Sequence, residues 1–310
     1  MNNLICICGP TASGKTGLAV ALVKQYDAEV VSCDSMQIYR GMDVGTAKPT
    51  AAEMDGVPHH LIDVADPGED FSVSRYVELA DAAIRDIHGR GKTAIICGGT
   101  GLYMDGLVKG EEYAPPSRDA QREYVESIAE KKGIEYVYDM LMDADPETAE
   151  KLHLSDRKRI IRAMEVFLIT GMPLSWHNAR SKERPPKYEP LWIGLSFRDR
   201  AKLYARIDRR VDQMMDQGLE AEVRALLDRG VDPKTTAMQA IGYKEMAEAL
   251  RGECTVGQAV EKIKQSSRRY AKRQLTWFRR NERIHWLYVD ETPDLLSAAA
   301  RLLEFDEKEP

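Results

Sequence analysis

Near its start the chain reads Gly9-Pro10-Thr11-Ala12-Ser13-Gly14-Lys15-Thr16, a match to the P-loop pattern G-x-x-x-x-G-K-[ST]. A strand-like segment, Leu4–Cys8, precedes this stretch, and a helix from about Lys15 to Tyr26 follows it. That is the context in which the pattern binds phosphate, because the helix N-terminus directs its dipole and free N–H groups at an anion. The stretch therefore predicts a site for a diphosphate or triphosphate.

Each residue type in this loop has a physical use. The glycines permit backbone conformations that turn several N–H groups toward one anion. Lys15 supplies a full positive charge, and the Thr16 hydroxyl is placed to ligate Mg²⁺. The reaction stays open at this point, because such a loop binds a magnesium diphosphate whether that group donates phosphate, holds a nucleotide or departs as diphosphate.

The segments around the loop predict a parallel sheet. A second strand is expected at 29–33, a third candidate at 61–64, and another at 93–97, which Gly98-Gly99 ends. An amphipathic helix at 72–89, with Ser72 as its N-cap, separates two of them. Strands that alternate with helices form right-handed βαβ units. We therefore expect an α/β fold with a P-loop NTPase-like parallel sheet core.

The pattern changes near Ala114-Pro115-Pro116, after which only helical periodicity follows as far as 170. Residues 156–170 are the clearest case, and a polar stretch at 181–190 closes the region before a strand resumes at 191–195. The simplest interpretation is an all-helical domain inserted in the core, because prolines at both edges are typical of domain boundaries. The predicted division is 1–114 for the first part of the core, 115–190 for the insertion and 191–310 for the second part.

The remainder of the chain is expected to be mostly helical. A long basic helix is predicted at about 255–281, a last strand at 284–289 and a closing helix at 293–305. The net charge of the chain is −6, yet nine lysines and arginines lie between Lys262 and Arg283 against one acid, Glu282. Because salt screens charges beyond about 10 Å, a local basic face can bind a polyanion on an acidic protein.

Composition favours a cytoplasmic enzyme. The 310 residues are 43% hydrophobic and 30% charged, as in ordinary globular proteins. No run approaches the roughly 18 apolar residues of a membrane span, and no basic leader precedes the first strand. The five cysteines form no C-x-x-C pair or Cys/His cluster, so neither a zinc site nor a disulfide framework is expected.

Asp34 directly follows the second predicted strand. Ligands of open α/β sheets collect at the carboxyl ends of the strands, where this side chain is expected. It can be a Mg²⁺ ligand, a general base, or simply the cap of a turn. The run Gly98-Gly99-Thr100-Gly101 reaches the same edge, and its glycines either allow close approach of a ligand or form a helix-entry turn.

Taken together, six segments resemble one family, the tRNA dimethylallyltransferases, also called tRNA isopentenyltransferases. The segments are GPTASGKT at 9–16, DSMQIYRGMDVGTAKP at 34–49, GGTGLY at 98–103, RAMEVF at 162–167, GYKE at 242–245 and KRQLTWFR at 272–279. The resemblance implies transfer of a dimethylallyl group from dimethylallyl diphosphate to N6 of adenosine 37 in tRNA. It also implies that the P-loop binds the leaving diphosphate with Mg²⁺ rather than ATP.

The resemblance also assigns roles to residues. Asp34 matches the catalytic aspartate of the family, and Lys15 and Thr16 would act on the diphosphate. An adenine N6 amine is a poor nucleophile, and a carboxylate that accepts its proton would help by about 10²–10⁴-fold. The lysine, the loop amides and Mg²⁺ would receive the charge that develops on the leaving group.

The implied contacts with the anticodon stem-loop of tRNA come from four segments of the chain and two single residues. They are Asp34, Ser35, Met36 and Gln37; Thr100 and Arg122; Lys158, Arg159, Ile160, Ile161 and Arg162; Gln239, Ala240, Ile241, Gly242, Tyr243 and Lys244; and Lys272, Arg273, Gln274, Leu275, Thr276, Trp277, Phe278 and Arg279. Trp277 and Phe278 are expected to be core anchors rather than stacking platforms. We also expect the target base to leave its stack and enter a pocket between the core and the insertion.

Three other functions compete with this one. A P-loop kinase would need mobile arginines that close on a transferred phosphoryl group. A prenyltransferase acting on free adenine nucleotides would share the P-loop and the carboxylate. A non-catalytic RNA-binding module would have no use for either. Nothing in the sequence indicates a protein partner or a membrane.

Overall fold

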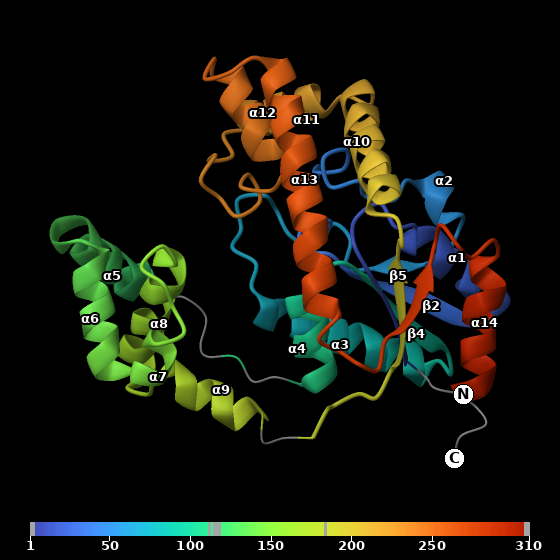
Figure 1. Cartoon of the computed structure of the whole chain (residues 1–310), viewed down its shortest axis with the longest axis horizontal. Coiled ribbons are helices and arrows are strands. Elements are labelled where there is room, and N and C mark those ends of the chain that lie inside the picture. Colours follow the sequence, from blue (N-terminus) through green and yellow to red (C-terminus); the bar gives the residue numbers. More distant parts are fainter. Residues whose placement is uncertain (1–3, 111–112, 114–118, 183–184, 307–310) are drawn as a thin grey trace. The chain divides into compact units, whose positions relative to one another are not determined.

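The structure is a computed structural model that describes residues 4–110, 113, 119–182 and 185–306 (Figure 1). The described residues divide into two compact units. The first falls within Met1–Phe71, Arg75–Leu107 and Tyr188–Pro310, and the second within Ser72–Ser74 and Val108–Lys187. The predicted first edge of the insertion, 114–116, lies outside the described residues.

The first unit contains a parallel sheet with strand order β3-β2-β4-β1-β5-β6. The strands are β1 (Leu4–Cys8), β2 (Ala28–Cys33), β3 (His59–His60), β4 (Thr93–Gly98), β5 (Leu191–Ser196) and β6 (His285–Tyr288). The α/β prediction is confirmed. The chain passes from β1 over β4 to β2, and later from β4 past β1 to β5, so the order reverses between β1 and β4. Ligands of open α/β sheets bind at such a point.

The register of the sheet aligns the carboxyl ends of β1, β2 and β4. Cys8 of β1 and Cys33 of β2 both pair with Gly98 of β4. The P-loop, Asp34 and the segment after Gly98 therefore leave the sheet at the same edge. Helices α10 (Arg200–Asp216), α11 (Leu219–Asp228), α12 (Tyr243–Leu250) and α13 (Val256–Phe278) gather beyond this edge (Figure 1).

Apolar side chains of the central strands pack against two helices. Ile7, Ile95 and Ile193 share one cluster with residues of α1 (Lys15–Gln25) and α14 (Leu295–Asp306). Strands that are covered by helices bury both faces and therefore carry continuous apolar runs. That composition made β1, β2, β4 and β5 predictable.

The strand predicted at 61–64 is wrong. The sheet takes only His59–His60, as β3, and the chain then turns. Leu61 and Asp63 have φ angles of 64° and 58°, which lie in the left-handed region and are incompatible with a strand. Asp63 is held in this turn because its carboxylate accepts a hydrogen bond from Lys48 Nζ at 2.6 Å.

Three helices remain between β2 and the second unit. They are α2 (Ala51–Met54), α3 (Val73–Gly89) and α4 (Gly101–Lys109), the last of which runs on toward the second unit. Of these three, only α3 was predicted, at 72–89. Helix α13 begins after a capping box in which Thr255 and Gln258 satisfy each other's backbone N–H groups. It ends at Phe278, three residues before the predicted end at 281.

The second unit is entirely helical in its described residues. It contains α5 (Asp119–Lys132), α6 (Ile134–Ala144), α7 (Pro146–Ala149), α8 (Arg157–Thr170) and α9 (Leu174–Lys182). Val137, Leu141, Ile160 and Met164 belong to a core of its own. The predicted inserted helical domain is confirmed, and α8 matches the helix expected at 156–170.

Candidate functional site

The loop between β1 and α1 has a strained, tightly wound backbone. Gly9 and Gly14 have φ angles of 144° and 91°, and Ala12 has a φ of 62°. A Cβ on Gly9 would lie 2.4 Å from the carbonyl oxygen of Leu195, so β5 leaves room only for glycine there. This winding turns the loop around the first turn of α1, as anion binding by backbone N–H groups requires.

Lys15 folds back over this loop. Its Nζ donates a hydrogen bond to the carbonyl oxygen of Pro10 at 2.7 Å. Burial, which removes water from the ammonium group, lowers the pKa of Lys15, and the positive charge of Arg210 adds to this effect. The Ser13 hydroxyl is buried and has no hydrogen-bond partner among the described residues. Cationic and hydroxyl groups thus surround the loop.

Asp34 caps a turn with one oxygen only. Its Oδ1 accepts hydrogen bonds from the N–H groups of Met36, at 2.9 Å, and Gln37, at 3.4 Å. Within the described residues, Oδ2 accepts none. The capping role that the sequence left open is therefore real, and it leaves one carboxylate oxygen for another partner.

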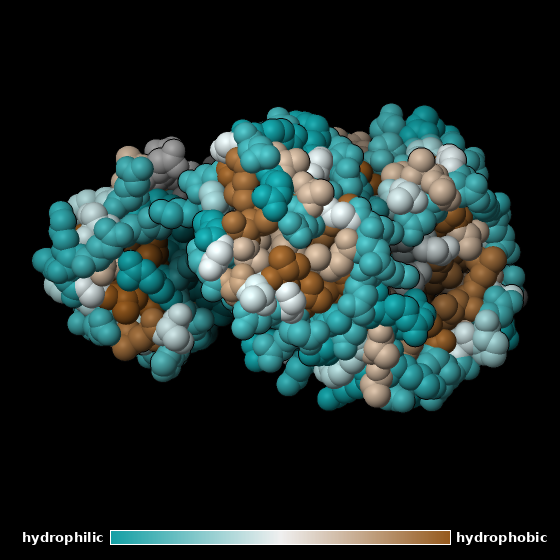
Figure 2. Space-filling view, turned by 90° about the horizontal axis from the view of Figure 1, so that it is seen from above, coloured by the Kyte–Doolittle hydropathy of each residue, from teal (hydrophilic) through white to brown (hydrophobic). Residues whose placement is uncertain are grey.

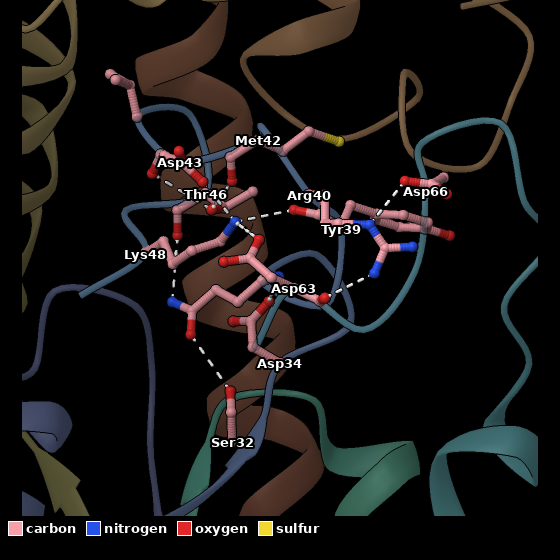
Figure 3. Close-up of polar contacts among 12 residues, drawn as sticks. Ser32, Asp34, Tyr39, Arg40, Met42, Asp43, Thr46, Lys48, Asp63 and Asp66 are labelled. Atoms are coloured by element: carbon pink, nitrogen blue, oxygen red, sulfur yellow. Dashed lines mark hydrogen bonds and ion pairs between the residues drawn. The ribbon is translucent and has the colours of Figure 1, made fainter. Parts of the chain in front are cut away.

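The segment after Asp34 is folded around a buried lysine (Figure 3). The side chain of Lys48 is 5% exposed, and its Nζ donates to the carbonyl oxygen of Tyr39 at 2.9 Å, to Asp43 at 2.5 Å and to Asp63 at 2.6 Å. A buried ammonium group is stable only when it is paired and hydrogen-bonded in this way. These contacts fix the loop that follows the candidate catalytic residue.

Helices α11 and α12 hold the same loop from outside. The carboxylate of Glu222 accepts hydrogen bonds from the N–H groups of Asp43, Val44 and Gly45 at 2.8, 2.8 and 3.0 Å. It also accepts one from the hydroxyl of Tyr243 at 2.5 Å. Sequence reasoning missed Glu222, since nothing in its local pattern marks it.

The ends of β2 and β4 are tied together at Thr100. Its hydroxyl oxygen accepts a hydrogen bond from the Ser35 N–H at 3.0 Å, and its own N–H donates to the Cys33 carbonyl at 3.2 Å. Tyr270 of α13 lies beside the Thr100 side chain. Burial raises the pKa of Tyr270, and the negative charge of Asp34 raises it further, so this phenol stays neutral beside the carboxylate.

Side chains of α13 pack directly against the backbone at the sheet edge. Gln274 donates from Nε2 to the Gly99 carbonyl at 3.0 Å and accepts at Oε1 from the Thr11 N–H at 2.8 Å. A Cβ on Gly99 would lie 2.2 Å from Gln274 Nε2, and one on Gly101 would lie 2.2 Å from Cδ1 of Trp277. The glycines of this run thus admit the helix, an explanation that sequence reasoning did not consider.

Two arginines of α10 complete the set of charges. Arg206 Nε donates to the Ala12 carbonyl at 3.0 Å, and Arg210 donates to the Ala47 carbonyl at 3.3 Å. Burial lowers the pKa of Arg210, which the charge of Asp34 partly offsets. Sequence reasoning missed both, although two arginines four residues apart on a helix were the available signal.

The implied tRNA contacts differ in exposure. The exposed side chains are Lys158, Arg159, Gln239, Lys244, Lys272, Arg273, Thr276 and Arg279. The buried ones are Ile160, Ile161, Ala240, Tyr243, Gln274, Leu275 and Phe278. Gly242 is also buried, and nine residues are half-buried: Asp34, Ser35, Met36, Gln37, Thr100, Arg122, Arg162, Ile241 and Trp277. Buried side chains shape the surface that their neighbours present, so direct contact is left to the exposed and half-buried residues.

The predicted site residues are divided between the two units. The P-loop, Asp34, Thr100 and α13 meet at one edge of the first unit. Arg122, half-buried and paired with Glu126 at 3.0 Å, and Lys158–Arg162 belong to the second unit. Within that unit, Arg162 pairs with the fully buried Glu165 at 3.1 Å.

The residues present fit a metal ion that arrives with a diphosphate. In the described part of the chain, no three His, Cys, Asp or Glu side chains converge as a metal site. Mg²⁺ typically keeps several waters and takes only one or two protein oxygens besides phosphate oxygens. The hydroxyl of Thr16 and the unoccupied oxygen of Asp34 are donors of this kind.

The distribution of apolar side chains can be followed on one face of the molecule. Figure 2 shows hydrophilic side chains over most of the visible face, with apolar groups gathered only in places. Of the helices described, none combines the length and the apolar character that crossing a bilayer demands.

Comparison with known families gives matches along nearly the whole chain. A family model described as IPP transferase matches residues 37–281, and one described as isopentenyl transferase matches residues 2–66. The tRNA dimethylallyltransferase of Caldanaerobacter subterraneus is 49% identical over 290 residues, which are 93% of this chain and 92% of that protein. That of Desulforudis audaxviator is 47% identical over 308 residues, 99% of this chain and 98% of the relative.

Solved structures agree. The tRNA isopentenylpyrophosphate transferase of Bacillus halodurans superposes with a TM-score of 0.73 at 42% identity and covers 99% of both chains. A eukaryotic dimethylallyltransferase acting on tRNA gives a TM-score of 0.83 at 28% identity, over 100% of this chain and 81% of the other.

Proposed function

The chain belongs to the tRNA dimethylallyltransferase family, and from this premise we propose how its residues carry out the reaction of that family. The enzyme transfers the dimethylallyl group from dimethylallyl diphosphate to N6 of adenosine 37 in tRNA and releases diphosphate. Its substrates are therefore tRNA and a prenyl diphosphate. The resemblance drawn from the six sequence segments is confirmed.

One observation carries the assignment of the site. The helix with the basic face, α13, is hydrogen-bonded through Gln274 to Thr11 of the P-loop and to Gly99 after β4. A surface suited to a polyanion and a loop suited to a diphosphate therefore adjoin each other, with Asp34 at the same sheet edge. A kinase of small molecules would have no use for this basic helix.

The proposed chemistry divides between two ends of the site. N6 of the adenine attacks C1 of the dimethylallyl group, and the bond from C1 to the diphosphate oxygen breaks with both electrons staying on that oxygen. Oδ2 of Asp34, which is not engaged in capping, accepts the proton that N6 loses. This proton acceptance supplies about 10²–10⁴-fold of the rate.

The departing diphosphate is bound by cations and N–H groups already in place. Lys15 and Arg210 are half-buried, which strengthens their attraction for an anion because little water screens them. Preorganised donors of this kind stabilise charge as it develops in the transition state. We add Arg210 to the residues that sequence reasoning assigned to this role.

Magnesium is proposed as the cofactor, held by the diphosphate oxygens and the Thr16 hydroxyl. When bound, it would neutralise charge on the diphosphate oxygens. A single protein ligand, Thr16, is proposed because the described residues contain no cluster of three or more His, Cys, Asp or Glu side chains that could hold the ion by themselves.

The tRNA side rests on charge. Lys272 and Arg273 of α13 and Arg279, which directly follows this helix, are exposed and suit phosphate contacts that position the anticodon loop without reading its bases. Adenosine 37 must then leave its stack, because N6 has to reach the carboxylate at the sheet edge. We further propose a cytoplasmic location, because tRNA is used there; the five free cysteines are compatible with it.

The function is tested by comparing acceptors. The enzyme is incubated with labelled dimethylallyl diphosphate, Mg²⁺ and one of three acceptors: the unmodified anticodon stem-loop, the same stem-loop with guanosine at position 37, or AMP. We expect label only in the first. Equal labelling of AMP would make this a transferase of free nucleotides and refute the proposal.

A further inference from the structure

Gln274 was expected to contact tRNA, but its side chain points into the protein. It is 5% exposed, and both ends of its carboxamide are engaged with backbone groups. Nε2 donates to the Gly99 carbonyl at 3.0 Å, and Oε1 accepts from the Thr11 N–H at 2.8 Å. These contacts leave the amide little capacity for a base or a phosphate.

The two partners of Gln274 follow β1 and β4, the two strands between which the strand order reverses. Thr11 lies in the P-loop after β1, and Gly99 directly follows β4. Only a side chain with a donor and an acceptor at opposite ends of one planar group satisfies both at once. Leaving either buried backbone group unpaired would cost about 1–3 kcal/mol.

Helix α13 packs so closely against the sheet edge that there is no space for a side chain on Gly99 or Gly101. A Cβ on Gly99 would lie 2.2 Å from Gln274 Nε2, and a Cβ on Gly101 would lie 2.2 Å from the indole of Trp277, one residue before Phe278. Phe278 itself is 1% exposed. A rotation or shift of this part of α13 therefore displaces the P-loop or breaks the contact at Thr11.

The opposite side of the same helical turn faces solvent and is cationic. Lys272 and Arg273 immediately precede Gln274 and are exposed, and the Arg273 guanidinium lies 5.5 Å from the ring centroid of Tyr270. An anion bound to these cations acts on the helix that carries the buried carboxamide. Two distinct ligand surfaces thus share one rigid element.

We propose that Gln274 is a positioning residue that couples tRNA binding on α13 to diphosphate binding in the P-loop. The proposal rests on the proposed function, because it takes the exposed cations of α13 as the tRNA surface. By fixing the loop through Thr11, Gln274 lets each substrate strengthen the binding of the other. Such coupling is reciprocal by thermodynamic necessity and amounts to at least about fivefold in typical cases.

The test measures a coupling ratio. The dissociation constant of inorganic diphosphate with Mg²⁺ is determined by calorimetry, with and without a saturating anticodon stem-loop. Gln274→Met, which keeps the length but has no donor or strong acceptor, is compared with the wild type. Gln265→Met, on the same helix and exposed, is the matched control.

We expect the stem-loop to tighten diphosphate binding at least about fivefold in the wild type and in Gln265→Met, and to leave it unchanged in Gln274→Met. Stem-loop affinity alone should stay within about twofold, since the exposed cations remain. Gln274→Glu keeps the acceptor for Thr11 and loses the donor to Gly99, so an intermediate ratio is expected; this variant also serves if Gln274→Met does not fold.

Two outcomes would overturn the proposal. One is a coupling ratio in Gln274→Met equal to that of the wild type. If the affinities for diphosphate and stem-loop both fell while this ratio stayed the same, the variant would have lost structure in general rather than coupling. The other is a wild-type ratio of one. Prenyl transfer is measured in parallel: transfer without coupling would refute only the role of Gln274, whereas a lack of transfer would refute the proposed function.

Discussion

The dual use of Asp34 leads to a prediction that separates chemistry from folding. Its Oδ1 caps the following turn through the N–H groups of Met36 and Gln37, and its Oδ2 is proposed to take the proton from N6. Asp34→Asn keeps an oxygen acceptor for the cap but cannot act as a base. Asp34→Ala removes both.

The expected magnitudes follow from these contacts. Both variants should lose about 10²–10⁴-fold in the rate of transfer, the usual contribution of a positioned base, which corresponds to about 2.7–5.4 kcal/mol at 1.36 kcal/mol per tenfold. Only the alanine variant should lose stability, by about 0.5–2 kcal/mol, the typical cost of removing an oxygen cap.

The assay is a single-turnover measurement with enzyme in excess over labelled tRNA and with saturating dimethylallyl diphosphate. Urea unfolding of the same preparations gives the stabilities. Similar rates in the two variants, with different stabilities, would support the proposed base. A transfer rate in Asp34→Asn close to that of the wild type would refute it, and a loss confined to Asp34→Ala would make the residue only a cap.

Three further predictions concern packing, acid stability and the loop after β2. Gly101→Ala should lower the free energy of unfolding by about 1–3 kcal/mol, because the added carbon would lie 2.2 Å from Trp277, whereas Gly257→Ala, which meets nothing within 4 Å, should not destabilise; urea unfolding compares them. The pKa of Glu29 lies well below its ordinary value of 4.5, mainly because its carboxylate is hydrogen-bonded to Arg90. The ionised carboxylate therefore stabilises the folded protein above about pH 4.5, and this stabilisation is lost as the pH falls toward the folded-state pKa. Glu29→Gln should therefore destabilise the protein at neutral pH and flatten the acid limb of the curve of melting temperature against pH; an identical acid limb would count against this. Glu222→Ala should cost about 2–3 kcal/mol and speed hydrogen exchange at residues 43–45, whose N–H groups it leaves unpaired; unchanged exchange there would contradict the capping role.

The features that the sequence predicts are those encoded in short, continuous stretches. The P-loop winds as it does because its own glycines permit it, and Asp34 reaches the sheet edge because it directly follows β2. Helix α13 begins at the capping box of Thr255 and Gln258, which lie three residues apart in the sequence. Local chemistry was sufficient in each case.

The features that escaped prediction depend on contacts between distant parts of the chain. Arg210 and Tyr270 come close to Asp34 only because α10 and α13 gather beyond the sheet edge, and no local pattern announces this. Gln274 lies within a basic segment that is expected to bind tRNA, so only the folded structure shows that its side chain points inward. The false strand at 61–64 is apolar enough for a sheet, but the bond from Lys48 to Asp63 imposes a turn.

The central claim is that the P-loop holds a leaving diphosphate while carbon is transferred. It is tested most directly by measuring, in one reaction with unmodified tRNA, the diphosphate released and the dimethylallyl groups found on N6 of adenosine after digestion to nucleosides. The account predicts one diphosphate for each modified adenosine, with ATP unable to replace dimethylallyl diphosphate. Phosphate release from ATP with no alkylated adenosine would contradict it.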